Sequence, residues 1–98
     1  MAYKIRWTEN AFEDLKETFN YLENEWSFKI SKEFLENCFL NIELISKFPY
    51  LGIQSTKDKS VRKISVSKYL VLYYRIEKEF ITLLNFFDTR RDPEKIRF

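Results

Sequence analysis

Cationic side chains in the second half of the sequence are the residues best suited to chemistry. They are Lys57, Lys59, Arg62, Lys63, Lys68, Arg90 and Arg91. Lysines and arginines gathered on one rim bind phosphates or carboxylates, and they also stabilise the charge that develops when an RNA 2'-hydroxyl attacks a phosphate. Such cleavage needs no metal but does need a general base, and a lysine serves only where burial or neighbouring cations lower its pKa. The pattern predicts an anion-binding rim and leaves a nuclease site open.

Composition excludes most other kinds of active site. The chain has no histidine, one cysteine and one glycine. Serine–histidine and cysteine–histidine pairs, zinc sites and glycine-rich phosphate loops are therefore excluded. Cys38 falls in an apolar helical stripe, and Glu13 and Glu17 recur at the helical spacing that is typical of solubilising charge. No cofactor and no metal are predicted.

Charge and hydropathy along the chain constrain its partners and location. Residues 1–47 carry six Lys/Arg against nine Asp/Glu, a net of −3, whereas residues 48–98 carry eleven against six, a net of +5. This asymmetry indicates a surface for nucleic acid, for a nucleic-acid-bound machine or for an acidic protein, or else ordinary solvated charge. A single cysteine excludes an internal disulfide, and there is neither a signal peptide nor a membrane-spanning apolar run. We expect a cytoplasmic protein without membrane contact.

Periodicity predicts the elements that position these residues. In chain order they are a strand over 3–7, helices over 9–25 and 28–47, a loop over 49–60, and strands over 61–66, 69–76 and 80–87. Thr8 and Ser27 are N-cap residues for the two helices, and Pro49 and Gly52 end the second. We expect one α+β domain over residues 1–98, in the order β-α-α-β-β-β, with a two-helix hairpin packed on one face of an antiparallel sheet.

Alternation within the strand over 69–76 separates the two faces of the sheet. The face toward the helices is predicted to receive Leu70, Leu72, Tyr74 and Ile76. The other face receives Tyr69, Tyr73 and Arg75, residue types that protein interfaces favour. This face is predicted to bind a protein partner, unless the loop over 49–60 or the C-terminal tail folds over it.

Short motifs occur in a fixed order along nearly the whole chain. They are Trp-Thr-x-x-Ala-x-x-Asp-Leu over residues 7–15, Pro-x-x-Gly over 49–52, Val-Arg at 61–62, Lys-Tyr at 68–69 and Arg-Arg-Asp-Pro over 90–93. Together they resemble the RelE/ParE superfamily of bacterial toxins, and more closely its ParE (plasmid stabilisation) branch. The resemblance implies the toxin of a type II toxin–antitoxin pair, held inactive by a cognate antitoxin protein.

The two branches of this superfamily act on different targets. ParE-like members are gyrase poisons that block replication, whereas RelE-like members cleave messenger RNA in the ribosome. The resemblance therefore implies a toxin that binds DNA gyrase rather than an enzyme, and direct DNA binding is not expected without the antitoxin. The alternatives are a metal-independent endoribonuclease acting on ribosome-bound mRNA, and a non-toxic relative that retains only antitoxin binding.

The resemblance and the charge pattern together assign candidate residues to each role. Target binding is assigned to Arg62, Lys63, Lys68, Arg90 and Arg91, antitoxin binding to Tyr69, Tyr73 and Arg75, and a nuclease site to Arg62 with Lys57, Lys59 and Arg90. Arg62 matches an arginine that RelE-like nucleases place on the scissile phosphate, although ParE-like toxins often keep one there. Asp88 stands where several relatives carry a histidine, which weighs against nuclease chemistry and raises doubt about toxicity by any route. A carboxylate there repels phosphate but could pair with Arg90 or Arg91.

Overall fold

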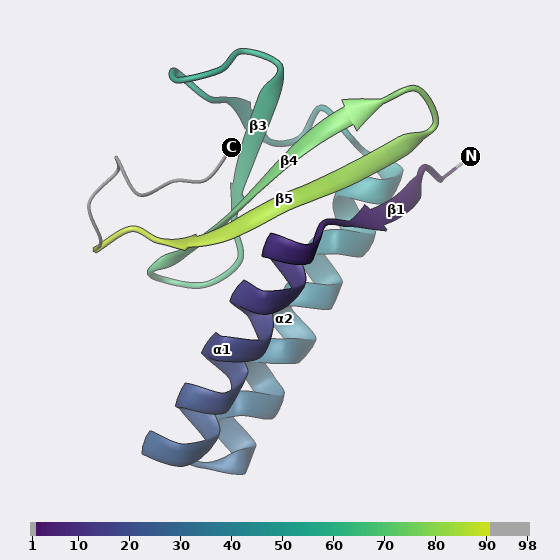
Figure 1. Cartoon of the computed structure of the whole chain (residues 1–98). Helices are drawn as coiled ribbons and strands as arrows, with labels where there is room; N and C mark the ends of the chain where they lie inside the picture. The colour runs from purple at the N-terminus through teal and green to yellow at the C-terminus, as the bar shows by residue number, and fades with distance from the viewer. Residues whose placement is uncertain (1, 91–98) are drawn as a thin grey trace.

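The computed structural model describes residues 2–90, which form two helices and a five-stranded sheet (Figure 1). The elements in chain order are β1 (Lys4–Trp7), α1 (Glu9–Glu25), α2 (Phe28–Lys47), β2 (Ile53–Gln54), β3 (Val61–Ser65), β4 (Leu70–Glu77) and β5 (Phe80–Asp88). The strands lie in the order β1-β5-β4-β3-β2, and the helices form a hairpin on one face of the sheet. The expected α+β class and the helix hairpin are confirmed.

Two features of the sheet differ from the expectation. Strand β1 runs parallel to β5, with Ile5 beside Ile81, so the sheet is mixed rather than antiparallel. The predicted loop over 49–60 contains the short strand β2, which pairs antiparallel with β3 at the edge of the sheet. Alternation near the N-terminus identifies a strand but not its neighbour, because the pairing joins opposite ends of the chain.

Both helices begin at the predicted capping residues. The side-chain oxygens of Thr8 and Ser27 accept hydrogen bonds from the backbone N–H groups of Ala11 and Ile30, at 3.1 and 3.2 Å. Figure 1 shows the helices running side by side, with their connected ends projecting beyond the sheet. Trp26, at this projecting tip, is 67% exposed. The tip therefore overhangs the sheet and leaves apolar side chains accessible.

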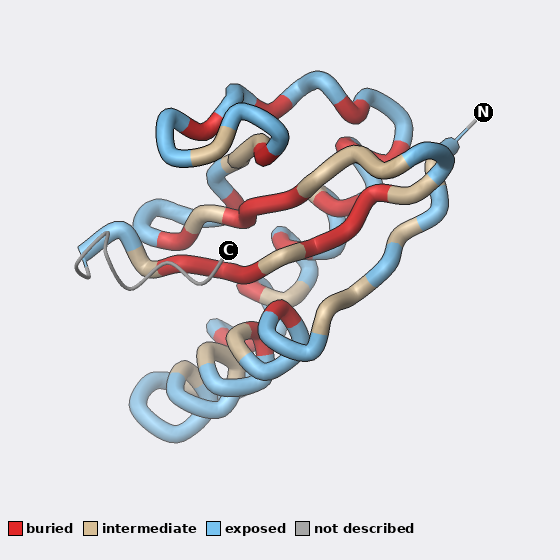
Figure 2. Tube along the Cα trace, turned by 45° about the horizontal axis from the view of Figure 1, so that its top comes forward, coloured by how far each residue is buried: buried red, intermediate tan, exposed pale blue. Residues whose placement is uncertain are grey.

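The main core lies between the helix hairpin and the sheet. Its buried members are Ala11, Leu15, Phe34, Cys38, Ile42, Ile45, Val66, Leu70, Leu72, Tyr74, Ile81, Leu83 and Phe86. Figure 2 shows long buried stretches along β4 and β5. Burial raises the pKa of the Cys38 thiol to about 12, so this thiol stays protonated at neutral pH. The predicted helix-facing set on β4 is confirmed.

The face of the sheet away from the helices carries a smaller apolar cluster. Val61, Tyr73 and Phe87 are buried there, with Val71 and Leu84 packed against them. Tyr73 is only 7% exposed, and burial raises the pKa of its hydroxyl. The expected open tyrosine surface is therefore absent at Tyr73. Across residues 2–90, neither helix is long and apolar enough to cross a membrane.

Candidate functional site

The Trp-Thr-x-x-Ala-x-x-Asp-Leu motif connects the start of α1 to β5 through side-chain hydrogen bonds. The Thr8 hydroxyl donates to the carbonyl of Leu83 at 2.7 Å, and Asp14 Oδ2 accepts the N–H of Phe86 at 3.0 Å. Because the pairing of β1 with β5 ends at Leu83, these side chains provide partners for the β5 backbone beyond that point. The motif therefore stabilises the attachment of α1 to β5.

The Pro-x-x-Gly loop is held by an arrangement that we call the loop clamp, made of Pro49, Gly52, Arg62 and Tyr74. The Tyr74 hydroxyl donates to the Pro49 carbonyl at 2.8 Å and accepts the Gly52 N–H at 2.9 Å. Arg62 Nη1 donates to the Gly52 carbonyl at 2.7 Å. A Cβ atom at Gly52 would lie 2.5 Å from the Tyr74 hydroxyl oxygen, so this position requires glycine on steric grounds.

The Arg62 guanidinium therefore makes two kinds of contact within the protein. Besides its bond to the loop, its guanidinium carbon lies 4.9 Å from the centre of the Tyr50 ring, within cation–π range. The Tyr50 side chain is 67% exposed. The Arg62 side chain is half-buried, and its bond from Nη1 fixes the conformation of the loop.

The turn before β3 is organised by Asp58. Its Oδ1 accepts hydrogen bonds from the N–H and the hydroxyl of Ser60, at 2.9 and 2.8 Å, and its Oδ2 lies 3.4 Å from Arg75 Nη2. Hydrogen bonds from Ser60, and then the charge of Arg75, lower the pKa of this carboxyl group. Arg75, expected to bind a partner, therefore pairs within the chain.

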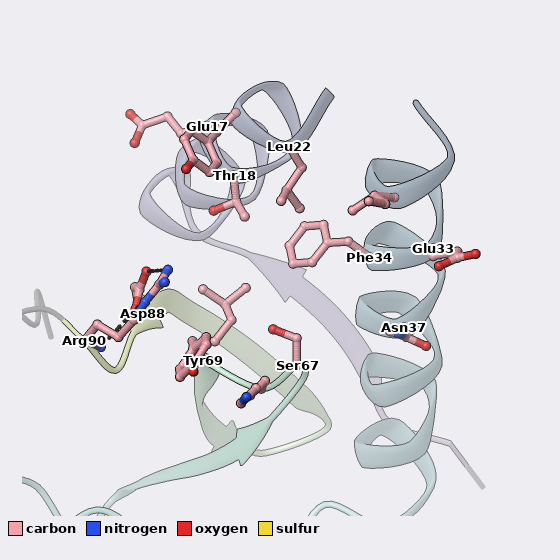
Figure 3. Close-up of a pocket in the computed structure, with 14 residues that line it drawn as sticks. Glu17, Thr18, Leu22, Glu33, Phe34, Asn37, Ser67, Tyr69, Asp88 and Arg90 are labelled. Carbon is pink, nitrogen blue, oxygen red and sulfur yellow. Dashed lines mark hydrogen bonds and ion pairs between the residues drawn. The ribbon is translucent and has the colours of Figure 1, made fainter. Parts of the chain in front are cut away.

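An apolar cleft of about 600 Å³ opens between the projecting helix tip and the start of β4 (Figure 3). Its apolar wall is formed by Tyr21, Leu22, Ile30, Phe34, Tyr69 and Leu70. Tyr21 and Tyr69 are 58% and 42% exposed. Large apolar side chains that line a concave surface in this way are typical of binding sites.

Tyr69, Asp88 and Arg90 border this cleft and are called the cleft lip. Arg90 Nε and Nη2 donate to Asp88 Oδ1 and Oδ2, at 3.0 and 2.7 Å, and the Arg90 N–H donates to Oδ1 at 2.9 Å. The Arg90 guanidinium carbon also lies 4.5 Å from the centre of the Tyr69 ring. The hydrogen bond to Asp88, aided by its charge, raises the pKa of Arg90. The expected pairing of Asp88 with Arg90 is therefore present.

The predicted cations do not share one rim. Lys57 and Lys59 lie in the turn before β3, Lys63 lies on β3, and Lys68 lies with Arg90 at the cleft. Arg91 falls outside the described residues. Within residues 2–90 no group of three histidine, cysteine or carboxylate side chains could hold a metal ion.

The predicted antitoxin-binding set is also divided. Tyr69 lies in the cleft beside the helices, whereas Tyr73 is buried on the opposite face and Arg75 pairs with Asp58. The cleft itself was not predicted from the sequence. Its sequence signal is that large side chains such as Tyr21 and Ile30 lie in the two predicted helices near the connection between them.

A family model described as the ParE toxin of the type II toxin–antitoxin system, parDE, matches residues 5–93. The chain belongs to this family. The matched range includes the loop clamp and the cleft lip of this ParE-family chain. A search of curated proteins gives no match.

Solved structures of toxins from several bacteria share the fold of this ParE-family chain. The chromosomal ParDE toxin–antitoxin system of P. aeruginosa gives a TM-score of 0.75 at 12% identity, covering 89% of this chain and 96% of that chain. The RelBE2 toxin–antitoxin complex of Mycobacterium tuberculosis gives 0.60 at 18% identity, covering 90% and 99%. YafQ of E. coli gives 0.51 at 14% identity, covering 90% and 94%. At these identities the likeness concerns the fold alone.

Proposed function

We propose that this ParE-family chain is the toxin of a type II toxin–antitoxin pair and acts in the cytoplasm by binding DNA gyrase. It blocks replication through protein contacts, with no catalytic residue or cofactor of its own, and a cognate antitoxin neutralises it. Membership of the ParE family supports the toxin class. The choice of protein binding over RNA cleavage rests on the surroundings of Arg62 and Arg90.

Both arginines that a nuclease would use are bonded to other groups of the chain. Arg62 Nη1 lies 2.7 Å from the Gly52 carbonyl oxygen, and Arg90 Nη2 lies 2.7 Å from Asp88 Oδ2. An RNA phosphate at Arg90 would have to compete with the Asp88 carboxylate, which would also repel it. At Arg62 it would meet a guanidinium whose Nη1 is already bonded to Gly52. The open surface near Arg90 is instead an apolar cleft, which suits a protein side chain better than a phosphate.

The cleft gives the antitoxin a direct route to neutralisation. Lys68 and Arg90 border it, and we assign target binding to these exposed cations. An antitoxin segment that fills the cleft against Tyr69 would cover both cations at once. Lys63 on β3 and Arg91 belong to the same proposed target-binding set, and Arg91 lies outside the described residues.

Induction of this chain alone in a bacterial host tests the proposal. DNA and protein synthesis are followed separately in the first minutes through incorporation of labelled thymidine and labelled methionine. We expect DNA synthesis to stop first and cleaved gyrase–DNA complexes to accumulate. Earlier arrest of protein synthesis would replace the proposal with a ribosome-dependent endoribonuclease, and arrest of neither would identify a non-toxic relative.

A pair of alanine variants locates the active surface in the same assay. Arg90→Ala removes the exposed cation of the cleft lip, and Lys59→Ala removes a cation of similar exposure from the turn before β3. If the cleft lip contacts the target, Arg90→Ala weakens growth arrest at equal protein level while Lys59→Ala does not. The reverse result would instead place the active surface at the turn before β3, where Lys57 and Lys59 lie.

A further inference from the structure

Two large aromatic side chains are exposed on the connection between α1 and α2, which we call the helix tip (residues 23–28). Trp26 and Phe28 are 67% and 63% exposed, and neither belongs to either apolar cluster described above. Trp26 caps α1 through its backbone N–H, which donates to the Leu22 carbonyl at 3.0 Å. Figure 1 shows this tip projecting beyond the sheet. Neither core packing nor capping therefore accounts for the two rings.

The charges of the helix tip are opposite to those that the helix dipoles favour. Glu23 and Glu25 lie in the last turn of α1, which contains no basic residue, and Lys29 lies in the first turn of α2, which contains no acidic residue. Carboxylates are favourable at the start of a helix and cations at its end. The Ser27 hydroxyl, not a carboxylate, caps α2, and within residues 2–90 none of the three charged side chains forms an ion pair. Helix stability therefore does not account for the two exposed carboxylates.

An exposed tryptophan and phenylalanine beside carboxylates match one kind of partner. Aromatic anchors that fill a pocket supply much of the affinity of protein interfaces. Carboxylates repel the phosphates of nucleic acids and of anionic membranes, so they favour a partner with cationic side chains. An enzyme that binds DNA presents such cations on its surface. The chemistry of the helix tip is therefore complementary to a basic protein surface rather than to a phosphate.

We propose that the helix tip inserts its two rings into an apolar pocket on the DNA-binding surface of gyrase, and that Glu23 and Glu25 face the cations around this pocket. The choice of gyrase as the partner rests on the proposed function. The contact is separate from the one assigned to the exposed cations of the cleft, so the target is held at two places on the chain. Trp26 and Phe28 provide the affinity of this second contact, and the carboxylates select a basic surface.

Binding of the full chain to purified gyrase holoenzyme, measured by biolayer interferometry at about 0.1 M salt, tests the two rings. The double variant Trp26→Ser with Phe28→Ser should weaken binding by about thirtyfold or more, the loss that interface anchors show. Phe12→Ser with Leu40→Ser removes side chains that are 55% and 63% exposed elsewhere on the helices, and it should leave the affinity unchanged. Urea unfolding checks that both variants keep the fold. Equal affinity of the tip variant and the unaltered chain would overturn the proposal.

A pair of charge-reversal variants tests the two carboxylates. Glu23→Lys with Glu25→Lys should weaken gyrase binding by about tenfold at about 0.1 M salt and by much less at about 0.5 M salt, where exposed charges are strongly screened. Glu36→Lys with Glu79→Lys makes the same change in net charge at exposed positions outside the helix tip, and it should have little effect. Equal losses in the two double variants would show that only total charge matters and would overturn the role of the carboxylates.

The same measurements separate this inference from the proposed function. If the unaltered chain does not bind gyrase, both fail, whereas equal binding with and without the two rings removes only the inference. A labelled single-stranded DNA is tested in parallel by fluorescence anisotropy, because exposed aromatic rings also stack on bases. DNA binding that is lost in the double variant Trp26→Ser with Phe28→Ser would identify a nucleic-acid contact and overturn the protein pocket.

Discussion

The loop clamp and the cleft lip each contain one arginine and one tyrosine, yet the two groups serve different purposes. In the loop clamp, Arg62 and the buried Tyr74 bind backbone groups of the loop that follows α2. In the cleft lip, Arg90 and the exposed Tyr69 contact each other and the neighbouring Asp88. The same residue types therefore hold the fold in one place and form an accessible surface in the other. The two tyrosines differ in burial, since Tyr74 is fully buried and Tyr69 is 42% exposed.

Gly52→Ala is expected to lower the stability of the protein most, because the added methyl group overlaps with atoms of the loop clamp. The added Cβ would lie 2.5 Å from the Tyr74 hydroxyl oxygen and 2.8 Å from the Lys63 carbonyl oxygen. Overpacking together with a broken hydrogen bond should lower the free energy of unfolding by about 3 kcal/mol. Urea unfolding measures this, with Thr56→Ala in the same loop as control; a loss under about 0.5 kcal/mol, the usual surface value, would contradict the clamp.

Tyr74→Phe tests the hydroxyl of the loop clamp without changing the ring. Removal of this hydroxyl leaves the Pro49 carbonyl and the Gly52 N–H without their partner, which should cost about 1–3 kcal/mol. Tyr69→Phe makes the same chemical change at the cleft lip, where the side chain is 42% exposed. Its expected effect on urea unfolding is below about 0.5 kcal/mol. Equal losses in the two variants would remove the distinction between the two groups.

Arg62→Lys keeps the positive charge of the loop clamp but loses the guanidinium geometry. A lysine cannot reproduce the bond from Nη1 to Gly52 together with stacking on Tyr50, so a loss of about 1 kcal/mol is expected. For a domain of this size that is roughly 4–8 °C in Tm. Arg90→Lys should leave Tm unchanged, and a comparable fall there would contradict the surface role of the cleft lip.

Local sequence signals predict the helices well and the sheet pairing poorly. The caps Thr8 and Ser27 and the apolar spacing give helix bounds that coincide with α1 and α2. Alternation also assigns Tyr74 to the core side of β4. The parallel pairing of β1 with β5 is not encoded in either segment by itself, because a strand pattern fixes which side chains share a face and not which strand lies beside it.

The site was harder to predict because its parts come from separate elements. Alternation placed Tyr69 on the same face as Tyr73, but Tyr69 precedes β4, and the face rule holds only within the strand. The cleft is formed by α1, α2 and the residues around Tyr69. The periodic pattern of any one of these segments therefore does not predict it. The sequence assigns Arg62 to target binding or to a nuclease site, whereas its partner in the structure, the Gly52 carbonyl, is a backbone group that side-chain patterns do not reveal.

Asp88→Asn is expected to have the smallest effect on stability and to separate the geometry of the cleft lip from its charge. Asparagine keeps an oxygen that can accept the Arg90 N–H, so the turn after β5 should persist. The ion pair it removes is exposed on the Arg90 side, where solvent screening makes such pairs weak, so the urea midpoint should not change measurably. A clear loss of stability would mean that Asp88 and Arg90 hold the fold as Arg62 does, and the two arginines would then no longer differ in kind.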